Sequence, residues 1–482
     1  MIADLKPYDE YKKSGLPWLG QVPSHWETKR AKSVLFPIDK RSETGQEELL
    51  TVSSAHGVIP RRGATVTMFK AKTYKGYKLC WPDDLVINSL WAWGGGLGVA
   101  RHHGIISTAY GVYRIRHNAE YHPGYLHALV RSRPFNWELV MRSKGIWISR
   151  LQLTDDSFLN APIPIFPPDE QELIVRFLDW ASVRLQKAIR AKRRVIALLE
   201  EQKQAIIHRA VTRGLDDTVP LKPSSLDWLG DVPEHWDVVR LKRLLSRRPR
   251  NGLSPAIASK GGIPTFSISA VRNGEVRIND SNLKYANVSE SASSAFRVRA
   301  GDVLAIRGNG NLKFVGRCGV VRDPVPDRCI YPDILIRLTC KREVSPDFLV
   351  ASMHSRSARQ QIEIRCKTAT GVYKISSGNL TSIMIPCPPP KEQAQLTHHI
   401  RDITDEYSKP IQSVQREIEL IREYRTRLIS DVVTGKLDVR DVARSLPSES
   451  ERSESIDMQP ADSDLDCLAD DELETELAEE AV

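Results

Sequence analysis

An internal tandem duplication constrains this chain more than any other feature of its sequence. Three short sequences occur twice and keep their order along the chain. They are WLGxVPxHW (residues 18–26 and 228–236), PPxEQ (167–171 and 389–393) and a VT-containing segment that ends in LD (210–216 and 432–438). The offset is 210 positions for the first pair and 222 positions for the other two. The sequence therefore predicts two copies of one unit, each of about 220 residues.

Each copy begins with a segment that predicts a mixed α/β globule. Short runs of β-branched and apolar residues, bounded by turn residues, predict strands. The clearest runs are residues 84–88, 112–115, 303–306 and 334–338. Short helices are expected between them, within residues 124–142 and 346–365.

Each copy ends in a segment that predicts a long helix. Apolar residues recur at alternating spacings of four and three through residues 174–206 and again through 396–432. This spacing is typical of a coiled-coil seam. Each helix would expose a long apolar seam if it stood alone. We therefore expect the two helices to pack on each other as an antiparallel pair, and the alternative is that each packs on another subunit.

Local backbone chemistry predicts where the long helices begin and end. Asp169 is a good N-cap for the first helix, because a short side-chain oxygen can accept from a free backbone N–H. Gly214 and Gly435 suit the C-terminal ends. Pro410 lies inside the second helix and is expected to kink or break it, because proline removes a backbone donor.

The predicted fold class is α+β (mixed α/β), with two similar globular domains joined by two long antiparallel coiled-coil-like helices and related by a pseudo-two-fold axis. The predicted domains are a first globule (1–166), a first long helix (167–215), a second globule (216–388), a second long helix (389–446) and an acidic tail (447–482).

Charge is distributed unevenly along the chain. The net charge is +9, but residues 447–482 contain fourteen acidic residues and one arginine, a net charge of −13. Residues 1–446 therefore carry +22. A body this basic favours a polyanionic partner, of which nucleic acid is the commonest. The tail has the composition of a disordered segment.

Several functional classes lack their sequence signatures. No apolar stretch is long enough to cross a bilayer, and no P-loop, HExxH or GxSxG motif occurs. The glycine-rich run at residues 93–98 lacks dinucleotide-loop spacing and predicts a tight turn that could let a backbone approach DNA. The tetrapeptide Asn/Asp-Pro-Pro-aromatic, usual in enzymes that methylate base amino groups, does not occur. The seven cysteines show no metal-ligand spacing, so reduced thiols and no structural metal are expected.

The repeated motifs carry a family resemblance. The WLGxVPxHW opening, the segments LLTVSSAHG (49–57) and ISTAY (106–110), and the PPxEQ sequence before a heptad helix occur together. With these features the chain resembles the specificity subunit of type I restriction–modification systems over residues ~10–445.

The resemblance implies a function. Each globule would be a target-recognition domain that reads one half of a bipartite double-stranded DNA site. The helices would set the spacing and dock two methyltransferase (M) subunits, while restriction (R) subunits would complete the complex. The chain would be non-catalytic, without a cofactor of its own, and located in a prokaryotic cytoplasm. S-adenosylmethionine, ATP and Mg would bind to the partners, whose complex would methylate adenine N6 and act as an ATP-dependent endonuclease. The alternatives are a helical scaffold or interaction protein, and a stand-alone DNA-modifying enzyme.

Candidate DNA-binding residues follow from side-chain chemistry, because phosphates attract Lys and Arg, and base edges bind Arg, Lys, Asn and Gln. The candidates are Lys70, Lys72, Tyr74, Lys75, Trp147, Arg150, Arg247, Arg248, Arg250, Asn251, Arg307, Asn309, Asn311, Lys313, Thr370, Tyr373 and Lys374. Among them, the polar loop 307–313 is the best candidate for reading bases.

Other residues are given a different role. Glu170, Gln171, Glu392 and Gln393, at the starts of the long helices, are predicted to cap the helix or to dock a partner. Arg190, Arg193 and Arg194 would either follow DNA phosphates or form an exposed polar face or a partner contact. Trp91 and Trp93 are interpreted as core or ligand-groove aromatics rather than as base stackers, and Trp26 and Trp236 as structural.

Overall fold

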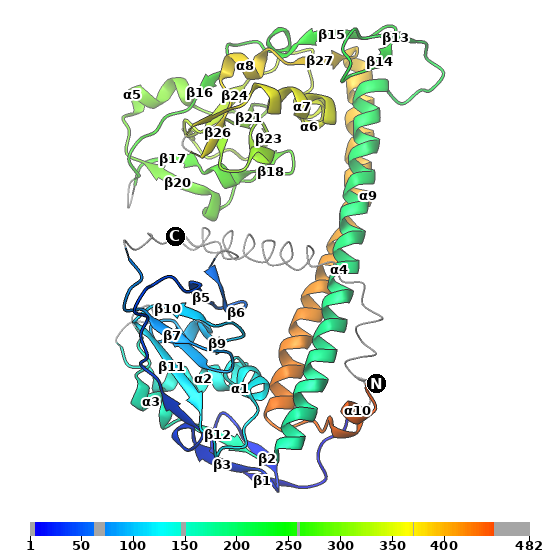
Figure 1. The fold of residues 1–482 in the computed structure, drawn as a ribbon. Coiled ribbons are helices and arrows are strands. Elements are labelled where there is room, and N and C mark those ends of the chain that lie inside the picture. Colours follow the sequence, from blue (N-terminus) through cyan, green and yellow to red (C-terminus); the bar gives the residue numbers. More distant parts are fainter. Residues whose placement is uncertain (1–4, 62–72, 146–150, 258–260, 370, 448–482) are drawn as a thin grey trace. The chain divides into compact units, whose positions relative to one another are not determined.

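The computed structural model describes the chain except for residues 1–4, 62–72, 146–150, 258–260, 370 and 448–482 (Figure 1). The acidic tail, apart from its first residue, therefore lies outside the described residues. The chain divides into two compact units. The first unit contains Met1–Ala191 and Arg416–Val482, and the second contains Lys192–Gln415. Within the described ranges, no helix is long and apolar enough to cross a membrane.

The first compact unit is built on a four-stranded antiparallel sheet. Its strand order is β4 (Leu35–Pro37), β11 (Tyr110–Ile115), β8 (Leu85–Asn88) and β9 (Leu97–Val99). The other strands form pairs: β1 (Tyr11–Lys13) with β2 (Gln21–Pro23), β3 (Glu27–Arg30) with β12 (Pro162–Ile165), β5 (Leu50–Ser53) with β6 (Gly57–Pro60), and β7 (Lys78–Cys80) with β10 (Gly104–Ile106). The short helices are α1 (Pro123–Val130), α2 (Arg133–Arg142), α3 (Asp155–Leu159) and α10 (Arg440–Arg444), with 3-10 turns η2 (Ala31–Ser33) and η4 (Ala92–Gly94).

The second compact unit is built on a six-stranded mixed sheet. Its strand order is β16 (Arg250–Asn251), β24 (Leu335–Leu338), β21 (Val303–Ile306), β23 (Cys318–Val321), β19 (Glu275–Val276) and β18 (Val271–Arg272). Further pairings join β13 (Leu221–Pro223) to β14 (Asp231–Pro233), β15 (Asp237–Arg240) to β27 (Met384–Cys387), β17 (Ile263–Phe266) to β20 (Leu283–Ala286), and β22 (Gly308–Asn309) through β26 (Val372–Lys374) to β25 (Lys367–Ala369). The short helices are α5 (Glu290–Ser293), α6 (Pro346–His354), α7 (Arg356–Arg365) and α8 (Ser377–Thr381), with 3-10 turns η6 (Leu241–Leu244), η7 (Ile268–Ala270), η8 (Asp280–Asn282), η9 (Ser294–Phe296) and η10 (Leu312–Phe314).

The two sheets share a common plan. In each unit the strand after WLGxVPxHW pairs antiparallel with the strand before PPxEQ, β3 with β12 and β15 with β27. A central antiparallel trio also corresponds, with β11, β8 and β9 in the first unit matching β24, β21 and β23 in the second. The four strands predicted at 84–88, 112–115, 303–306 and 334–338 are all present. The duplication seen in the sequence is therefore a duplication of the fold.

Each predicted helical segment of the globules is a pair of helices. Ser132 separates α1 from α2, and Ser355 separates α6 from α7. The serine hydroxyl accepts from a backbone N–H at the start of the next helix, that of Phe135 in one case and Ala358 in the other. In both units a new helix thus begins after an N-cap serine at the same place in the fold.

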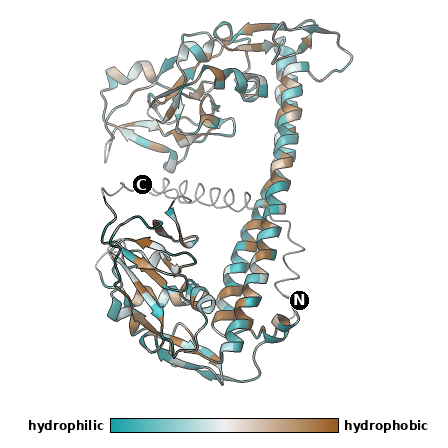
Figure 2. Ribbon diagram, viewed as in Figure 1, coloured by the Kyte–Doolittle hydropathy of each residue, from teal (hydrophilic) through white to brown (hydrophobic). Residues whose placement is uncertain are grey.

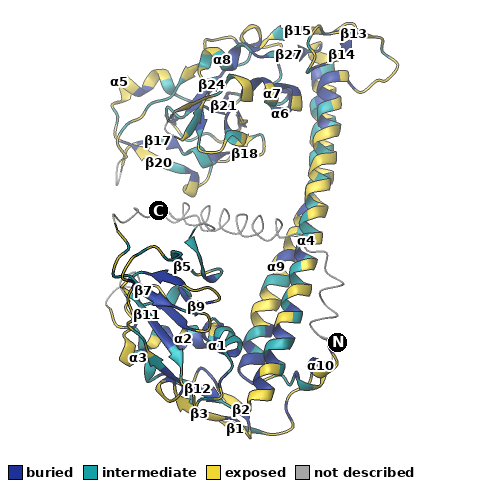
Figure 3. Cartoon of the chain, in the orientation of Figure 1, coloured by how far each residue is buried: buried dark blue, intermediate teal, exposed yellow. Residues whose placement is uncertain are grey.

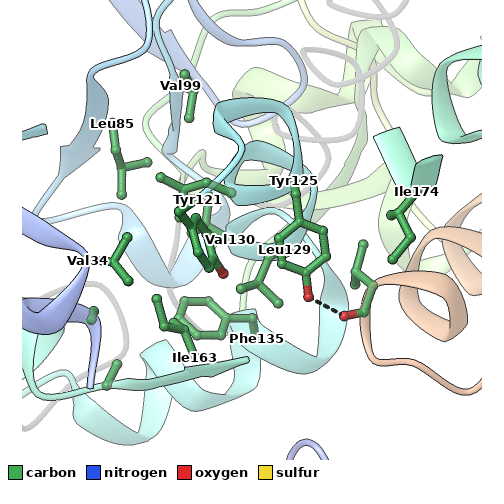
Figure 4. Packing of buried hydrophobic residues seen from close by; sticks show 14 of the residues in the cluster. Val34, Leu85, Val99, Tyr121, Tyr125, Leu129, Val130, Phe135, Ile163 and Ile174 are labelled. Carbon is green, nitrogen blue, oxygen red and sulfur yellow. Dashed lines mark hydrogen bonds between the residues drawn. The ribbon is translucent and has the colours of Figure 1, made fainter. Parts of the chain in front are cut away.

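The core of the first unit lies between its sheet and its helices. Figure 4 shows Tyr125, Leu129 and Phe135 of α1 and α2 packed beside sheet residues such as Leu85. Tyr125 is fully buried, and its hydroxyl donates to the carbonyl oxygen of Val433 over 2.8 Å. Figure 3 shows the burial of the central strands of this unit. This core therefore includes the C-terminal end of a long helix that is remote in sequence.

The two long helices are α4 (Pro168–Arg213) and α9 (Pro390–Val433). Ile174 and Leu178 of α4 share a buried cluster with Leu428 and Val432 of α9 in the first unit. At the other end of α4, residues 207–211 share a cluster with Leu396 of α9 in the second unit. The start of each helix thus packs on the end of the other, which confirms the predicted antiparallel pair and the predicted mixed fold. Figure 2 shows hydrophobic and hydrophilic residues alternating along α4.

Some details of the long helices differ from the predictions. Pro410 was expected to kink or break the helix. The helix α9 continues through Pro410, so the break is wrong, while the kink stays a prediction. Pro410 is exposed, and water can reach the carbonyl group that the missing N–H leaves unpaired. Asp169 lies in the first turn of α4, which begins at Pro168, and so is not its N-cap. Val195, assigned to the seam, is 44% exposed. Gly214 and Gly435 follow the helix ends with positive φ angles of 77° and 75°, as predicted.

Candidate nucleic-acid interface

Two candidate segments of the second unit, predicted separately, lie side by side. The loop 307–314 follows strand β21, and we name it the Asn309 loop. Its strand β22 pairs with β26, so that Gly308 faces Lys374 and Asn309 faces Tyr373. The backbone N–H of Ile375 also donates to the carbonyl of Arg307 over 2.9 Å. The loop and the β25–β26 hairpin therefore form a single loop–hairpin cluster.

The Asn309 loop is shaped by its own side chains. The Oδ1 atom of Asn309 accepts from the backbone N–H of Asn311 over 2.8 Å. The Oδ1 atom of Asn311 accepts in turn from the backbone N–H of Lys313 over 2.9 Å. Asparagine commonly forms turns of this kind. Each side-chain oxygen is thus used within the loop, and the two residues are half-buried (Asn309) and exposed (Asn311).

Arg359 of α7 anchors the Asn309 loop by hydrogen bonds to backbone carbonyl groups. Its guanidinium donates to the carbonyl oxygens of Val315 (2.6 Å), Leu312 (3.3 Å) and Lys313 (3.2 Å). Burial lowers the pKa of this guanidinium below its usual value. A half-buried arginine that donates to three carbonyls is a strong local anchor, because charged donors form stronger hydrogen bonds.

The loop–hairpin cluster is basic. Lys313, Arg317, Lys367 and Lys374 are exposed, and Lys367 lies opposite Lys374 in the β25–β26 hairpin. Arg307 is half-buried and approaches Asp333 at 3.4 Å. Exposed Lys and Arg side chains attract phosphates, and binding to them releases counterions. The cluster thus combines phosphate-binding charges with amide groups that can read base edges.

The first unit contains the same frame. The loop at residues 89–96, which we name the Trp91 loop, follows β8 as the Asn309 loop follows β21. Leu153 N–H donates to the carbonyl of Ser89 over 2.9 Å, which reproduces the bond between Ile375 and Arg307. The side chain of Asn136 donates to the carbonyls of Ala92 (3.3 Å) and Trp93 (3.0 Å). Asn136 is the fourth residue of α2 and Arg359 is the fourth of α7, so the anchor comes from the same place.

A second arginine supports the Trp91 loop. Arg131 follows α1, and its guanidinium donates to five carbonyl oxygens from two loops. They are those of Ser53, Ser54, Ala55, Gly95 and Leu97, at 2.6 to 3.5 Å. Burial lowers the pKa of Arg131 as it does that of Arg359. The turn after β5 and the Trp91 loop are therefore held by one side chain.

The two tryptophans of the Trp91 loop were interpreted as core or ligand-groove aromatics, and they differ in burial. Trp93 is half-buried. Trp91 is 56% exposed, so a core role is wrong for it. Its ring stacks on that of Trp93 with centroids 5.1 Å apart and an interplanar angle of 20°. The indole N–H of Trp93 donates to the carbonyl of Leu90 over 2.9 Å. The sequence offered a signal for this loop, because it follows a predicted strand at the place that the loop 307–313 occupies in the second copy.

The remaining DNA-binding candidates are dispersed. Lys75, Arg247 and Arg248 are exposed, and Tyr74 is half-buried against Tyr77. Arg250 lies over the ring of Phe296 at 5.3 Å, and Asn251 accepts from the hydroxyl of Ser377 over 2.9 Å. Five candidates lie outside the described residues: Lys70, Lys72, Trp147, Arg150 and Thr370. On the long helix, Arg194 is exposed, while Arg190 and Arg193 are half-buried.

The duplicated motifs meet at the base of each globule. Glu170, which is 3% exposed, accepts from the hydroxyl of Tyr8 (2.7 Å), Nε2 of His25 (2.7 Å) and Nε1 of Trp26 (3.0 Å). Burial and the charge of Glu170 raise the pKa of Tyr8. Gln171 is fully buried and binds the backbone at His122, Glu120 and Phe166. The histidine and tryptophan that end the WLGxVPxHW motif are thus hydrogen-bonded to the glutamate of the PPxEQ motif in the same unit.

The second unit repeats this arrangement in a more open form. Glu392 accepts from Nε2 of His235 (2.9 Å) and Nε1 of Trp236 (3.0 Å), and its side chain is 26% exposed. Gln393 accepts from the backbone N–H of Ser345 and donates to the carbonyl of Pro388. Trp26 and Trp236 are both fully buried, as a structural role requires. Glu170, Gln171, Glu392 and Gln393 therefore bind within their own units, and their docking of a partner stays a prediction.

Other kinds of site receive no support from the part of the chain that the structure describes. No group of three His, Cys, Asp or Glu side chains that could hold a metal ion occurs there. The six described cysteines are free thiols. Burial raises the pKa of four of them, Cys80, Cys318, Cys329 and Cys340, to about 12. These thiols are therefore poor nucleophiles, because the thiolate is the reactive form.

Comparison with known proteins addresses the family resemblance. No family model matches the chain. It is 28% identical over 283 residues to the type I restriction enzyme EcoKI specificity subunit of Escherichia coli K12, which covers 58% of each protein. It is 21% identical over 292 residues to the MjaVIII specificity subunit of Methanocaldococcus jannaschii, covering 59% of this chain and 64% of that one. The predicted resemblance to type I specificity subunits is confirmed.

The limits of these matches are clear. The chain spans less than two thirds of the length of either specificity subunit in the matched region. A solved structure, described as showing complex assembly and conformational transition of the type I R-M system, matches with a TM-score of 0.57 and 17% identity. The match covers 86% of this chain and 99% of that one. This structural likeness supports the fold.

Proposed function

We propose that the chain is the DNA sequence-recognition subunit of a type I restriction–modification complex. Each compact unit reads one half of a bipartite double-stranded DNA target. The observation that carries the proposal is the similarity to type I specificity subunits. The recurrence of the same sequence motifs in both halves of this chain supports two reading units. The basic loop–hairpin cluster of the second unit supplies phosphate-binding and base-reading groups, and the first unit has an equivalent frame.

The chain itself is proposed to be non-catalytic. Two methyltransferase subunits would bind S-adenosylmethionine and methylate adenine N6, and restriction subunits would use ATP and Mg to cleave DNA. The complex would act in a prokaryotic cytoplasm. The helices α4 and α9 belong to both compact units and would set the distance between the half-sites. The Glu side chains of the two PPxEQ motifs bind the tryptophan of their own unit and so would hold each helix to its globule, and the docking of a partner by the PPxEQ residues stays part of the proposal.

A selection experiment tests recognition. The chain is assembled with its methyltransferase subunits and used to select from a randomised DNA library. Two short base blocks separated by a fixed gap are expected, because the two units differ in sequence and read independently. Selection of a single block, or of no preferred sequence, would refute the proposal. Methylation or cleavage by the isolated chain would instead favour a stand-alone DNA-modifying enzyme.

A length change tests the spacing role of the helices. Seven residues are inserted after Ala191 in α4 and after Gln415 in α9, where both positions are exposed. Seven helical residues add about 10 Å, or about three base pairs of duplex. The gap between the selected blocks should lengthen accordingly, while the blocks themselves stay the same. An unchanged gap would show that the helices do not set the spacing.

A further inference from the structure

The two equivalent loops carry opposite chemistry at their tips. The Asn309 loop presents amide and lysine groups, which suit hydrogen bonding to base edges and phosphates. The Trp91 loop presents Leu90, 49% exposed, and Trp91, 56% exposed. Exposed large apolar side chains in a row mark a surface that contacts something else.

The Trp91 loop holds its exposed ring in a fixed place. The carbonyl of Trp91 accepts from the backbone N–H groups of Gly94 (3.0 Å) and Gly96 (2.9 Å). Gly95 adopts a φ angle of 79°, which favours glycine, and a Cβ atom on Gly96 would come within 2.9 Å of the Trp91 carbonyl oxygen. The loop is thus closed by its glycines, and the ring is supported by its stack on Trp93. A side chain held in this way loses little conformational entropy when it binds.

The surroundings of the loop carry positive charge. The segment that runs beside it is bonded to Ser89 through Leu153, and Lys144 forms a two-bond bridge with Gln152 in that same segment. Lys144 is exposed. The corresponding segment of the second unit is the β25–β26 hairpin with Lys367 and Lys374. An exposed apolar ring whose neighbouring segment carries the exposed Lys144 suits a duplex better than an apolar protein surface, because phosphates flank the bases on both sides.

Building on the proposed function, we propose that Trp91 reads the first half-site by apolar contact with its bases. The ring can pack on a thymine methyl group in the major groove, or against the face of a base at a step that it opens. Both contacts discriminate between bases without a hydrogen bond. The two halves of the target would then be read by different chemistry from equivalent loops, by shape and methyl groups in one half and by amide groups in the other.

The test uses the assembled complex and the bipartite target that it selects. Trp91→Ala should lower affinity for that target about tenfold and relax base preference in one block, while the other block keeps its preference. Trp91→Phe keeps a flat apolar ring and should retain most of the preference. Replacing each thymine by uracil then separates the two contacts, because loss of affinity on removing a methyl group identifies the major-groove contact and no loss identifies the base face.

Trp137 supplies a matched control. It lies in the same unit on α2 and is 51% exposed, but it lines a surface pocket with Pro17 and Thr426 instead of the loop. Trp137→Ala should leave both base preferences unchanged. If Trp91→Ala leaves both blocks as selective as before, or weakens binding equally for all sequences, the ring does not read bases and the inference is overturned. Failure of the unaltered complex to select two blocks would instead refute the proposed function.

Discussion

The Trp91 loop and the Asn309 loop show how one frame can carry two surfaces. Both follow a buried central strand, both receive an N–H bond from the segment before the last strand, and both are held by the fourth residue of a helix. The anchor is a neutral amide in one unit, from Asn136, and a half-buried guanidinium in the other, from Arg359. The frame depends on backbone carbonyls, which every residue possesses, so the tip residues can change without loss of the loop. The comparison therefore separates the interactions that hold the loop in its conformation from the side chains that the loop exposes at its tip.

The largest expected difference between the two units is in how much stability each loses when the glutamate of its PPxEQ motif is removed. Glu170→Ala would leave the buried N–H of Trp26 and the hydroxyl of Tyr8 without an acceptor, and should lower the free energy of unfolding by about 3 kcal/mol. Glu392→Ala should cost about 1 kcal/mol, because its side chain is partly exposed and water can replace it. Urea denaturation measures the change, and hydrogen exchange assigns it to a unit. Equal losses of unfolding free energy in the two variants would show that water does not replace the Glu392 side chain any better than it replaces Glu170.

Both units are expected to lose stability in acid, which per residue is the next largest effect. His127 and His354 are half-buried residues, and the burial of their rings lowers the pKa of each to about 4. Each accepts a backbone N–H bond, from Val99 and Cys318 respectively, which only the neutral ring can do. The unfolded state binds protons below a pKa of about 6.5 and the folded state only near 4, so stability falls as pH drops between these values. The loss should approach about 3 kcal/mol per histidine near pH 4.

Two substitutions isolate this acid effect. His127→Asn places an amide oxygen near the Nδ1 position, and His354→Gln places one near Nε2, so each keeps an acceptor that does not titrate. Denaturation midpoints measured from pH 7 to pH 4.5 should then fall less steeply than those of the unaltered chain. An identical slope in the double variant would show that other groups cause the acid sensitivity.

The anchors of the two loops should differ in strength. Arg359→Ala removes three carbonyl bonds and is expected to lower stability by about 2 kcal/mol, whereas Asn136→Ala removes two and should cost about 1 kcal/mol. Exchange of the amide hydrogens in residues 307–315 and 89–96 should speed up in the matching variant alone. If the Trp91 loop stays protected in Asn136→Ala, Arg131 is sufficient to hold it.

The smallest expected effect concerns charge. Lys313→Gln and Lys374→Gln should each weaken DNA binding by a similar factor for all sequences and reduce the slope of log affinity against log salt by about one. Binding titrations at several salt concentrations measure the slope. Lys12→Gln, an exposed lysine on β1 outside the cluster, provides the control and should leave the slope unchanged. A change in base preference in the lysine variants would mean that they contact bases rather than phosphates.

The sequence predicted those parts of the fold that depend on local pattern and repetition. The strand Val303–Ile306 and the helix ends before Gly214 and Gly435 were predicted closely, because turn residues and apolar spacing specify them. The break at Pro410 was wrong, because packing along a long helix outweighs the loss of one exposed backbone bond. The exposed side of Val195 shows that a regular seam need not be fully covered.

The candidate site was predicted only in pieces. Arg307, Asn309, Tyr373 and Lys374 were identified by residue type, but their pairing joins segments more than sixty positions apart. Local periodicity contains no information on such a pairing. The exposure of Trp91 was missed for a related reason. A tryptophan beside a buried strand is usually buried, and the side chains that hold its loop, Asn136 and Arg131, come from the α1–α2 segment, which is remote in sequence.

The way the first unit closes also determines when it can fold. Its core needs Leu428 and Val432 of α9, and its N-terminal segment is bonded to the far end of the chain, with Asp438 N–H donating to Lys6 and Tyr11 donating to Lys436. The second unit consists of an uninterrupted stretch, Lys192–Gln415. During synthesis on the ribosome, the unit that is made first must therefore wait for the last segment of the chain, and the unit that is made second can be complete before it.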